Sequence, residues 1–151
     1  MASDVSSRCG SIAALCALLI GLPCAPCAAQ PFDVHEADFR IANFRFETGE
    51  TLPELKIHYR TLGALQRDSS GHASNAVLIL HGTGGSGAQF VGTQRADDLF
   101  GGELFGPGQP LDIQRYFIVF PDSIGHGKSS KPSDGLHAHF PRYGYHDAVE
   151  A

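Results

Sequence analysis

The segment that most constrains the fold is a short apolar run followed directly by a glycine-rich loop. Residues 75–80 (NAVLIL) carry no charge, and residues 81–87 (HGTGGSG) follow without a break. A run of this length, bounded by turn residues, is typical of a strand buried on both faces of a parallel sheet. A second such run, residues 116–120 (YFIVF), ends at Pro121 and Asp122. The two runs predict an α/β fold.

The segments around these runs complete the expected order of elements. Residues 39–46 and 55–62 are rich in β-forming residues with partial alternation, and they predict an antiparallel hairpin or meander. Residues 88–100 are expected to begin a helix. Residues 146–151 are expected to start another, with Asp147 placed favourably at its N-terminus. The chain is therefore predicted to open with antiparallel strands and to continue with parallel strands and helices.

The first thirty residues differ from the rest and predict an export signal. Residues 11–22 (SIAALCALLIGL) form an uncharged apolar run after Arg8, and Cys27 and Ala29 are small residues at the positions that a signal peptidase reads. The run is short for a membrane span. We predict a signal peptide over residues 1–29, a domain over residues 30–151, a periplasmic or secreted location and no membrane attachment after cleavage. A mis-assigned start codon or a retained anchor are the alternatives.

Cysteine content and charge exclude several classes of function. All four cysteines lie within the predicted leader, so a chain that starts at Gln30 would have no disulfide, no thiolate nucleophile and no zinc–thiolate site. The net charge is −5 and no basic cluster is present, which argues against nucleic acid as a partner. We expect no cofactor and no metal, and the sequence does not indicate an oligomeric state.

The loop after the first buried run carries the clearest chemical signal. Acyl transfer places negative charge on a carbonyl oxygen, and enzymes stabilise that charge with preorganised backbone N–H groups. Glycines allow the backbone to turn sharply and approach a substrate closely. A His-Gly followed by further glycines, directly after a buried strand, is similar to the oxyanion loop of α/β-hydrolases. Gly82, Thr83 and Gly84 are therefore the candidate oxyanion residues, and a generic glycine-rich turn is the alternative.

Two nucleotide-binding interpretations of the same region are weaker. Gly82, Gly84 and Gly87 satisfy G-x-G-x-x-G. The candidate ribose acid at the end of the next buried strand, Asp122, lies farther along the chain than the dinucleotide motif requires. The triplet 127–129 (GKS) suggests a P-loop, but Asp122 stands where its first glycine should be, and a carboxylate there would repel phosphate. We instead expect Asp122 to organise the turn of pattern D-x-x-G-x-G-x-S that begins with it.

The chain contains no recognisable nucleophile. No serine lies in G-x-S-x-G, and the nearest approach is Ser86, which is followed by Gly87 and then by alanine. Without a nucleophile, the histidines have nothing to activate. His137 and His139, taken with Asp122, could be read as a metal site, but exposed histidines on a loop are the preferred interpretation.

Four segments together resemble the homoserine O-acetyltransferase branch of the α/β-hydrolases. They are residues 52–63 (LPELKIHYRTLG), 75–85 (NAVLILHGTGG), 104–112 (LFGPGQPLD) and 116–130 (YFIVFPDSIGHGKSS). The resemblance implies an eight-stranded, mostly parallel sheet, a helical cap and a Ser-Asp-His triad that acts through an acyl-enzyme on a small-molecule acyl substrate. The triad would lie beyond Ala151, so only the oxyanion loop, Gly82 to Gly84, carries over.

The expected function is therefore that of the N-terminal segment of an exported ester or amide hydrolase or O-acyltransferase. The acetyltransferases that it resembles take acetyl-CoA, a cytosolic donor, so hydrolysis fits an exported protein better than CoA-dependent transfer. We expect the 151-residue chain by itself to be inactive and unstable, because half a parallel sheet leaves a strand edge and apolar faces uncovered. A truncated, non-catalytic binding module is the alternative.

Overall fold

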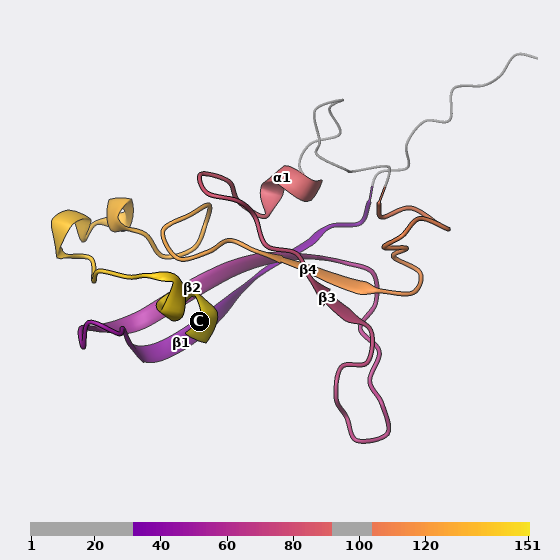
Figure 1. Cartoon of the computed structure of the whole chain (residues 1–151), viewed down its shortest axis with the longest axis horizontal. Helices are drawn as coiled ribbons and strands as arrows, with labels where there is room; N and C mark the ends of the chain where they lie inside the picture. The colour runs from indigo at the N-terminus through magenta and orange to yellow at the C-terminus, as the bar shows by residue number, and fades with distance from the viewer. Residues whose placement is uncertain (1–31, 92–103) are drawn as a thin grey trace, which may run out of the picture.

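The computed structural model describes residues 32–91 and 104–151, which form a four-stranded mixed sheet with short helices around it (Figure 1). The strands are β1 (His35–Arg45), β2 (Thr51–Leu62), β3 (Ala76–Leu78) and β4 (Phe117–Pro121), and their order across the sheet is β1-β2-β4-β3. The predicted leader, residues 1–29, lies outside the described residues.

The predicted hairpin is confirmed and is longer than the sequence pattern indicates. β1 and β2 pair antiparallel from His35 opposite Thr61 to Arg45 opposite Thr51. The turn between them is closed by a hydrogen bond of 2.9 Å from the Phe46 N–H to the Glu50 carbonyl, and Gly49 takes a φ of 86° there. A positive φ is accessible to glycine without the steric penalty of a Cβ, which explains the residue at this position.

The two apolar runs form the parallel pair of the sheet, which confirms the α/β prediction. β3 runs parallel to β4, with Val77 opposite Ile118, and β4 also pairs antiparallel with β2. Leu78 is 61% exposed, and Leu80 just beyond the strand is 63% exposed, which agrees with the expectation that part of a parallel sheet leaves apolar faces uncovered. The described segments leave this face of β3 uncovered.

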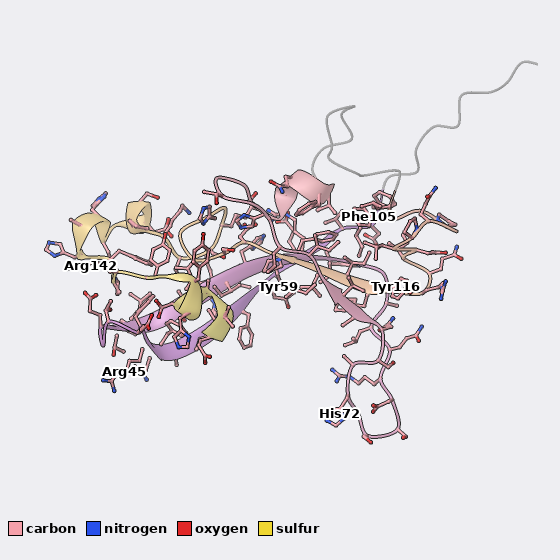
Figure 2. The ribbon with its side chains drawn as sticks, viewed as in Figure 1. Arg45, Tyr59, His72, Phe105, Tyr116 and Arg142 are labelled. Carbon is pink, nitrogen blue, oxygen red and sulfur yellow. The ribbon has the colours of Figure 1, made fainter. Side chains whose placement is uncertain are left out.

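Two apolar clusters hold the sheet and its connections together. One gathers the end of the hairpin with the segment after β4, and it consists of Phe44, Phe46, Leu52, Leu55, Ile124 and Phe140. The other packs α1 (Ala88–Val91) and residues 104–116 against β4, and it consists of Leu62, Phe90, Phe105, Ile118 and Phe120. Phe105 lies edge-on to Phe120 at 5.4 Å between ring centroids. Figure 2 shows Phe105 on this side of the sheet, whereas His72 lies at the tip of the loop between β2 and β3.

The helices are short. The predicted helix over 88–100 begins as α1, and residues 92–100 of that prediction lie outside the described residues. Two single 3-10 turns, Pro132–Asp134 and His137–His139, precede α2 (Tyr145–Glu150). The Asp147 carboxylate accepts a hydrogen bond of 2.9 Å from the Gly144 N–H, which confirms the favourable placement of this acid at a helix start. Within the described part of the chain, no helix has the length and apolar character that a membrane crossing requires.

Candidate functional site: the loops after the parallel strands

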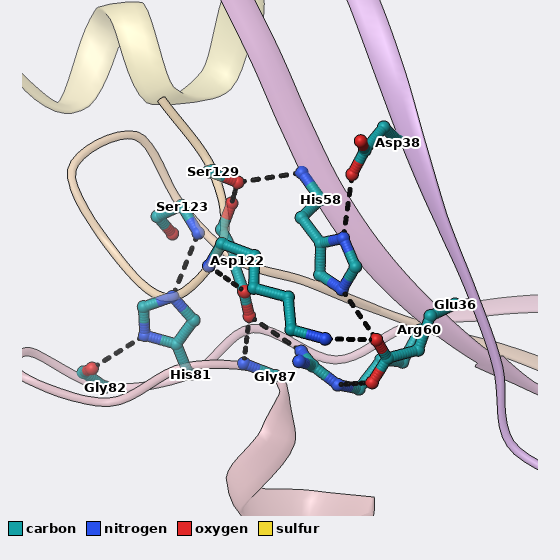
Figure 3. Close-up of polar contacts among 11 residues, drawn as sticks. Glu36, Asp38, His58, Arg60, His81, Gly82, Gly87, Asp122, Ser123 and Ser129 are labelled. Carbon is teal, nitrogen blue, oxygen red and sulfur yellow. Dashed lines mark hydrogen bonds and ion pairs between the residues drawn. The ribbon is translucent and has the colours of Figure 1, made fainter. Parts of the chain in front are cut away.

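Two loops meet where the parallel strands β3 and β4 end. We call residues 81–87 the glycine loop and residues 122–130 the Asp122 loop. In open α/β sheets, ligands bind outside the carboxyl ends of the parallel strands, so this is the place to look for function. Figure 3 shows that side chains of β1 and β2 also reach this point, and that Asp122 lies at the centre of their contacts.

Asp122 is fully buried and its carboxylate joins three segments of the chain. Oδ1 accepts hydrogen bonds from the Gly87 N–H at 2.7 Å and from the Arg60 guanidinium at 3.0 Å. Oδ2 accepts from the Lys128 N–H at 2.8 Å. A buried carboxylate is tolerated only when it is paired and hydrogen-bonded. Asp122 therefore fixes the end of the glycine loop relative to β2 and to its own loop.

Ser129 closes the Asp122 loop onto β2. Its hydroxyl donates a hydrogen bond of 2.6 Å to the Asp122 carbonyl and accepts one of 2.8 Å from the His58 N–H. The next residue continues along β2, because the Ser130 N–H donates to the Lys56 carbonyl at 2.9 Å. Asp122 and Ser129 are the first and last residues of the predicted D-x-x-G-x-G-x-S turn, so the expectation that Asp122 organises this turn is confirmed.

A charged network extends from Asp122 to the surface. Arg60 is buried and donates through Nε to Glu36 of β1 at 3.0 Å, besides its bond to Asp122. Glu36 also pairs with the ammonium of Lys128. The hydrogen bond from Lys128, together with the positive charge of Arg60, lowers the pKa of Glu36. The first strand of the chain is thereby tied to the Asp122 loop.

His58 lies beside this network and is buried between two carboxylates. Its Nδ1 is 2.8 Å from the Asp38 carboxylate, and its Nε2 is 3.4 Å from Glu36. The hydrogen bond to His58 is the largest cause that lowers the pKa of Asp38. His58 Nε2 has no hydrogen-bond partner among the described residues. His58 is on β2, away from the glycine loop, so its role here is to hold β1 against β2.

His81 connects the two loops through both of its ring nitrogens. Nε2 lies 3.0 Å from the Ser123 backbone N–H, and Nδ1 lies 2.9 Å from the Gly82 carbonyl. A backbone N–H can only donate and a carbonyl can only accept. The network therefore assigns His81 as a neutral imidazole with its proton on Nδ1. The ring of His126 from the Asp122 loop lies against it, at 5.1 Å between centroids.

The glycine loop presents its backbone donors to the outside. The Gly82 carbonyl accepts from the Gly85 N–H at 3.0 Å as well as from His81. In a trans peptide the C=O and the following N–H point in opposite directions, so holding the Gly82 carbonyl also fixes the Thr83 N–H. Gly82, Thr83 and Gly84 are exposed, and their N–H groups donate no hydrogen bond to any described residue. Apart from the adjacent residues of the loop, no heavy atom of the described residues lies within 4 Å of a Cβ built on Gly82 or Gly84.

The structure does not support the competing site predictions. The carboxylate oxygens of Asp122 already accept hydrogen bonds from Arg60, Gly87 and Lys128, so this carboxylate is not available to a ribose. The same carboxylate lies inside the turn that contains residues 127–129 (GKS), where a P-loop would hold a phosphate. His137 and His139 are exposed and are not brought to the buried Asp122. Among the described residues, no group of three potential ligands could hold a metal ion. Ser86 makes no hydrogen bond to a described histidine, so nothing in this part of the chain activates it.

The comparisons with known proteins bear on this arrangement. No family model matches the chain. The homoserine O-acetyltransferase of Thermobifida fusca is 37% identical over 115 residues, which is 70% of this chain and 29% of that protein. The chain is related to the homoserine O-acetyltransferases of the α/β-hydrolase superfamily. It spans less than a third of the length of this relative.

Solved structures support the same relationship. The homoserine O-acetyltransferase of Bacillus anthracis superposes with a TM-score of 0.59 at 26% identity, over 78% of this chain and 34% of that one. An acetylester hydrolase of Corynebacterium glutamicum superposes with a TM-score of 0.60 at 24% identity, over 78% of this chain and 31% of that one, which supports the fold alone. The predicted resemblance is thus confirmed, and the described sheet corresponds to part of a larger α/β-hydrolase fold.

Sequence patterns missed part of the site. Arg60 and Glu36 are not singled out by any motif, although they hold Asp122 and the Asp122 loop in place. The sequence offers one weak signal, an arginine near the end of a predicted strand, since an arginine that is buried there requires a carboxylate partner. That signal indicates that a partner exists but does not say which carboxylate it is.

Proposed function

We propose that this chain supplies the oxyanion-stabilising part of an acyl-transfer enzyme of the α/β-hydrolase type. The observation that carries the proposal is the anchored Gly82 carbonyl, which is held by two donors while the N–H groups of Gly82, Thr83 and Gly84 donate to none of the described residues. Preorganised donors that need no rearrangement stabilise a developing oxyanion most effectively. Thr83 is the best placed, because its N–H belongs to the anchored peptide.

Within this role, Gly82 and Gly84 have a steric function. Both are exposed, none of the described residues outside the adjacent loop positions occupies the space where a side chain would be, and Gly84 takes a φ of 81°. The carbonyl oxygen of an acyl substrate can therefore approach the backbone N–H groups without meeting a Cβ. The nucleophile, its base and the acid that orients the base are proposed to come from the rest of the whole protein, by the acyl-enzyme mechanism that the relationship suggests.

The reaction that fits best is hydrolysis of an ester or amide of a small molecule. This choice follows from the proposed export of the protein, since an exported enzyme would not meet a cytosolic acetyl donor. O-acyl transfer is the second candidate, and it is favoured by the name of the T. fusca relative. Parallel assays of ester hydrolysis and of acetyl transfer to homoserine, with the same preparation, separate the two.

A substitution that removes one N–H tests the oxyanion role. In the whole protein, Thr83→Pro removes the proposed donor, whereas Thr83→Ala keeps it and removes only the side chain. We expect Thr83→Pro to lower kcat/KM for p-nitrophenyl acetate by about 100-fold to 1,000-fold, as the loss of an oxyanion donor does elsewhere. Thr83→Ala should stay within about 3-fold of the wild type. Equal activities of the two variants would refute the proposal.

Export is a separate proposal and has a separate test. Residues 1–29 fused to a reporter enzyme that folds only outside the cytoplasm should give an active reporter. Leu18→Arg, which places a charge in the middle of the apolar run, should abolish that activity. A reporter that is inactive with the natural leader would place the protein in the cytoplasm and would remove the argument against an acetyl-CoA donor.

A further inference from the structure

We propose that His81 is a positioning residue that aims the Thr83 N–H by tying the glycine loop to the loop after β4. This inference rests on the proposed oxyanion role of the glycine loop. His81 is the first residue of that loop, and its ring bridges the Gly82 carbonyl at 2.9 Å and the Ser123 backbone N–H at 3.0 Å (Figure 3). The side chain thus links the first turn of one loop to the start of the other.

The bridge through His81 does something that the other anchor of the Gly82 carbonyl cannot do. The Gly85 N–H belongs to the same loop, so its bond moves with the loop as a unit. The bond to Ser123 fixes the position of the glycine loop relative to β4, since Ser123 directly follows the buried Asp122 at the end of that strand. Asp122 fixes the other end of the glycine loop through the Gly87 N–H. With both ends held, the Thr83 peptide has one orientation relative to the sheet.

The same contacts exclude His81 as a general base. A base needs a free lone pair on a ring nitrogen, but Nε2 of His81 uses its lone pair to accept from Ser123. Nδ1 carries the proton that is donated to Gly82. His126 is the titratable group in ring contact with His81, and its Nδ1 lies 3.0 Å from the Ile124 carbonyl. His81 therefore acts through the backbone that it holds.

A glutamine can separate positioning from proton transfer. A primary amide has one donor group, its NH₂, and one acceptor, its carbonyl oxygen, at a separation similar to that of the two imidazole nitrogens, but it cannot take up a proton near neutral pH. In the whole protein, His81→Ala should lower kcat for p-nitrophenyl acetate by about 10-fold to 100-fold with KM within about 2-fold, because a misaimed donor costs rate. His81→Gln should restore kcat to within about 5-fold of the wild type. A glutamine variant as slow as the alanine variant would overturn the proposal.

The partner side of the bridge provides an independent test that does not alter the histidine. Ser123→Pro removes the N–H that His81 accepts, and Ser123→Ala keeps it. We expect Ser123→Pro to lower kcat as much as His81→Ala, and the double variant to be no slower than either one, because both changes break one link. Ser123→Ala should behave as the wild type. Losses that multiply in the double variant would show that His81 and Ser123 act separately and would overturn the proposal.

The tautomer can be read without any activity. In the whole protein, long-range proton–nitrogen correlation spectra of labelled imidazoles should show His81 protonated at Nδ1 and unprotonated at Nε2. A proton on Nε2 would overturn the proposal even where a variant fails to fold. The positioning role of His81 and the oxyanion role of Thr83 can fail separately. Full activity in Thr83→Pro would refute the oxyanion role. Full activity in His81→Ala, with an impaired Thr83→Pro, would refute the positioning role alone.

Discussion

The carboxylate of Asp122 occupies the space into which a side chain at position 127 would project, where the chain has Gly127. Gly127 has a φ of 50°, and a Cβ built on it would lie 2.0 Å from Asp122 Oδ2. Gly127 therefore allows the backbone to turn around the Asp122 carboxylate, so that the next N–H group, that of Lys128, donates a hydrogen bond to it.

A side chain at Gly127 should therefore cost more than backbone strain. We expect Gly127→Ala to lower the free energy of unfolding by about 2–4 kcal/mol, since strain at a positive φ adds to a clash with a buried carboxylate. Gly71→Ala is the matched control, because Gly71 has a φ of 84° and, apart from its chain neighbours, no heavy atom of the described residues lies within 4 Å of a Cβ built on it. That control should cost about 1 kcal/mol. Urea unfolding of both variants decides the matter, and equal losses would mean that Asp122 does not crowd this position.

Loss of the Asp122 carboxylate should remove hydrogen bonds from three segments of the chain and destabilise the fold. Asp122→Ala leaves the buried Arg60 guanidinium without one partner and the N–H groups of Gly87 and Lys128 unsatisfied. We expect a loss of about 3–5 kcal/mol of stability and faster hydrogen exchange at the Gly87 amide. Asp68→Ala is the control, because Asp68 also accepts two backbone N–H bonds but lies exposed in the loop before β3. Its cost should stay below about 1 kcal/mol.

Acid should weaken the packing of α2 against the hairpin turn. Hydrogen bonds from the N–H groups of Glu47 and Gly144 lower the pKa of Asp147 from its ordinary value of 3.8. A carboxyl whose pKa is lower in the folded state stabilises the fold at pH values above its ordinary pKa. This contribution is lost as the pH falls from about 4 through the folded-state pKa. Asp147→Asn should therefore be less stable than the wild type at pH 6 and lose less stability between pH 4 and pH 2.

Unfolding midpoints measured across this range test the acid prediction. Asp33→Asn, at an exposed carboxyl, should keep the slope of the wild type. A slope that is unchanged in Asp147→Asn would show that this carboxylate does not link stability to pH.

The exposed side of β3 should behave as an uncovered interior surface. Leu78 and Leu80 have more than half of their side-chain surface exposed. In the 151-residue chain, replacing both with lysine should reduce dye binding and self-association with little change in stability, because no described segment covers them. In the whole protein the same change should destabilise by about 2 kcal/mol or more per residue. Sedimentation and dye fluorescence distinguish the two cases, and equal tolerance in both would mean that this face stays open.

The sequence predicted the elements of the fold better than their contacts. Local patterns located the hairpin and the two parallel strands, because alternation and apolar runs report directly on the faces of a strand. The D-x-x-G-x-G-x-S spacing correctly predicted that Asp122 organises its loop. The apolar run of β3 correctly indicated a strand suited to burial, but an apolar run does not show which segment covers it. The bridge from His81 to Ser123 could not be predicted, because the two residues meet only through strand pairing.

The partners of Asp122 also have a consequence for the order of folding. Arg60, Gly87 and Lys128 lie 62, 35 and 6 positions from Asp122 in the sequence. The hairpin of β1 and β2 can close early because its pairing is local, whereas the carboxylate is satisfied only after three separate loop closures. The geometry of the two loops is then among the last features to form. Substitutions at Asp122 should accelerate unfolding and leave the rate of hairpin formation almost unchanged.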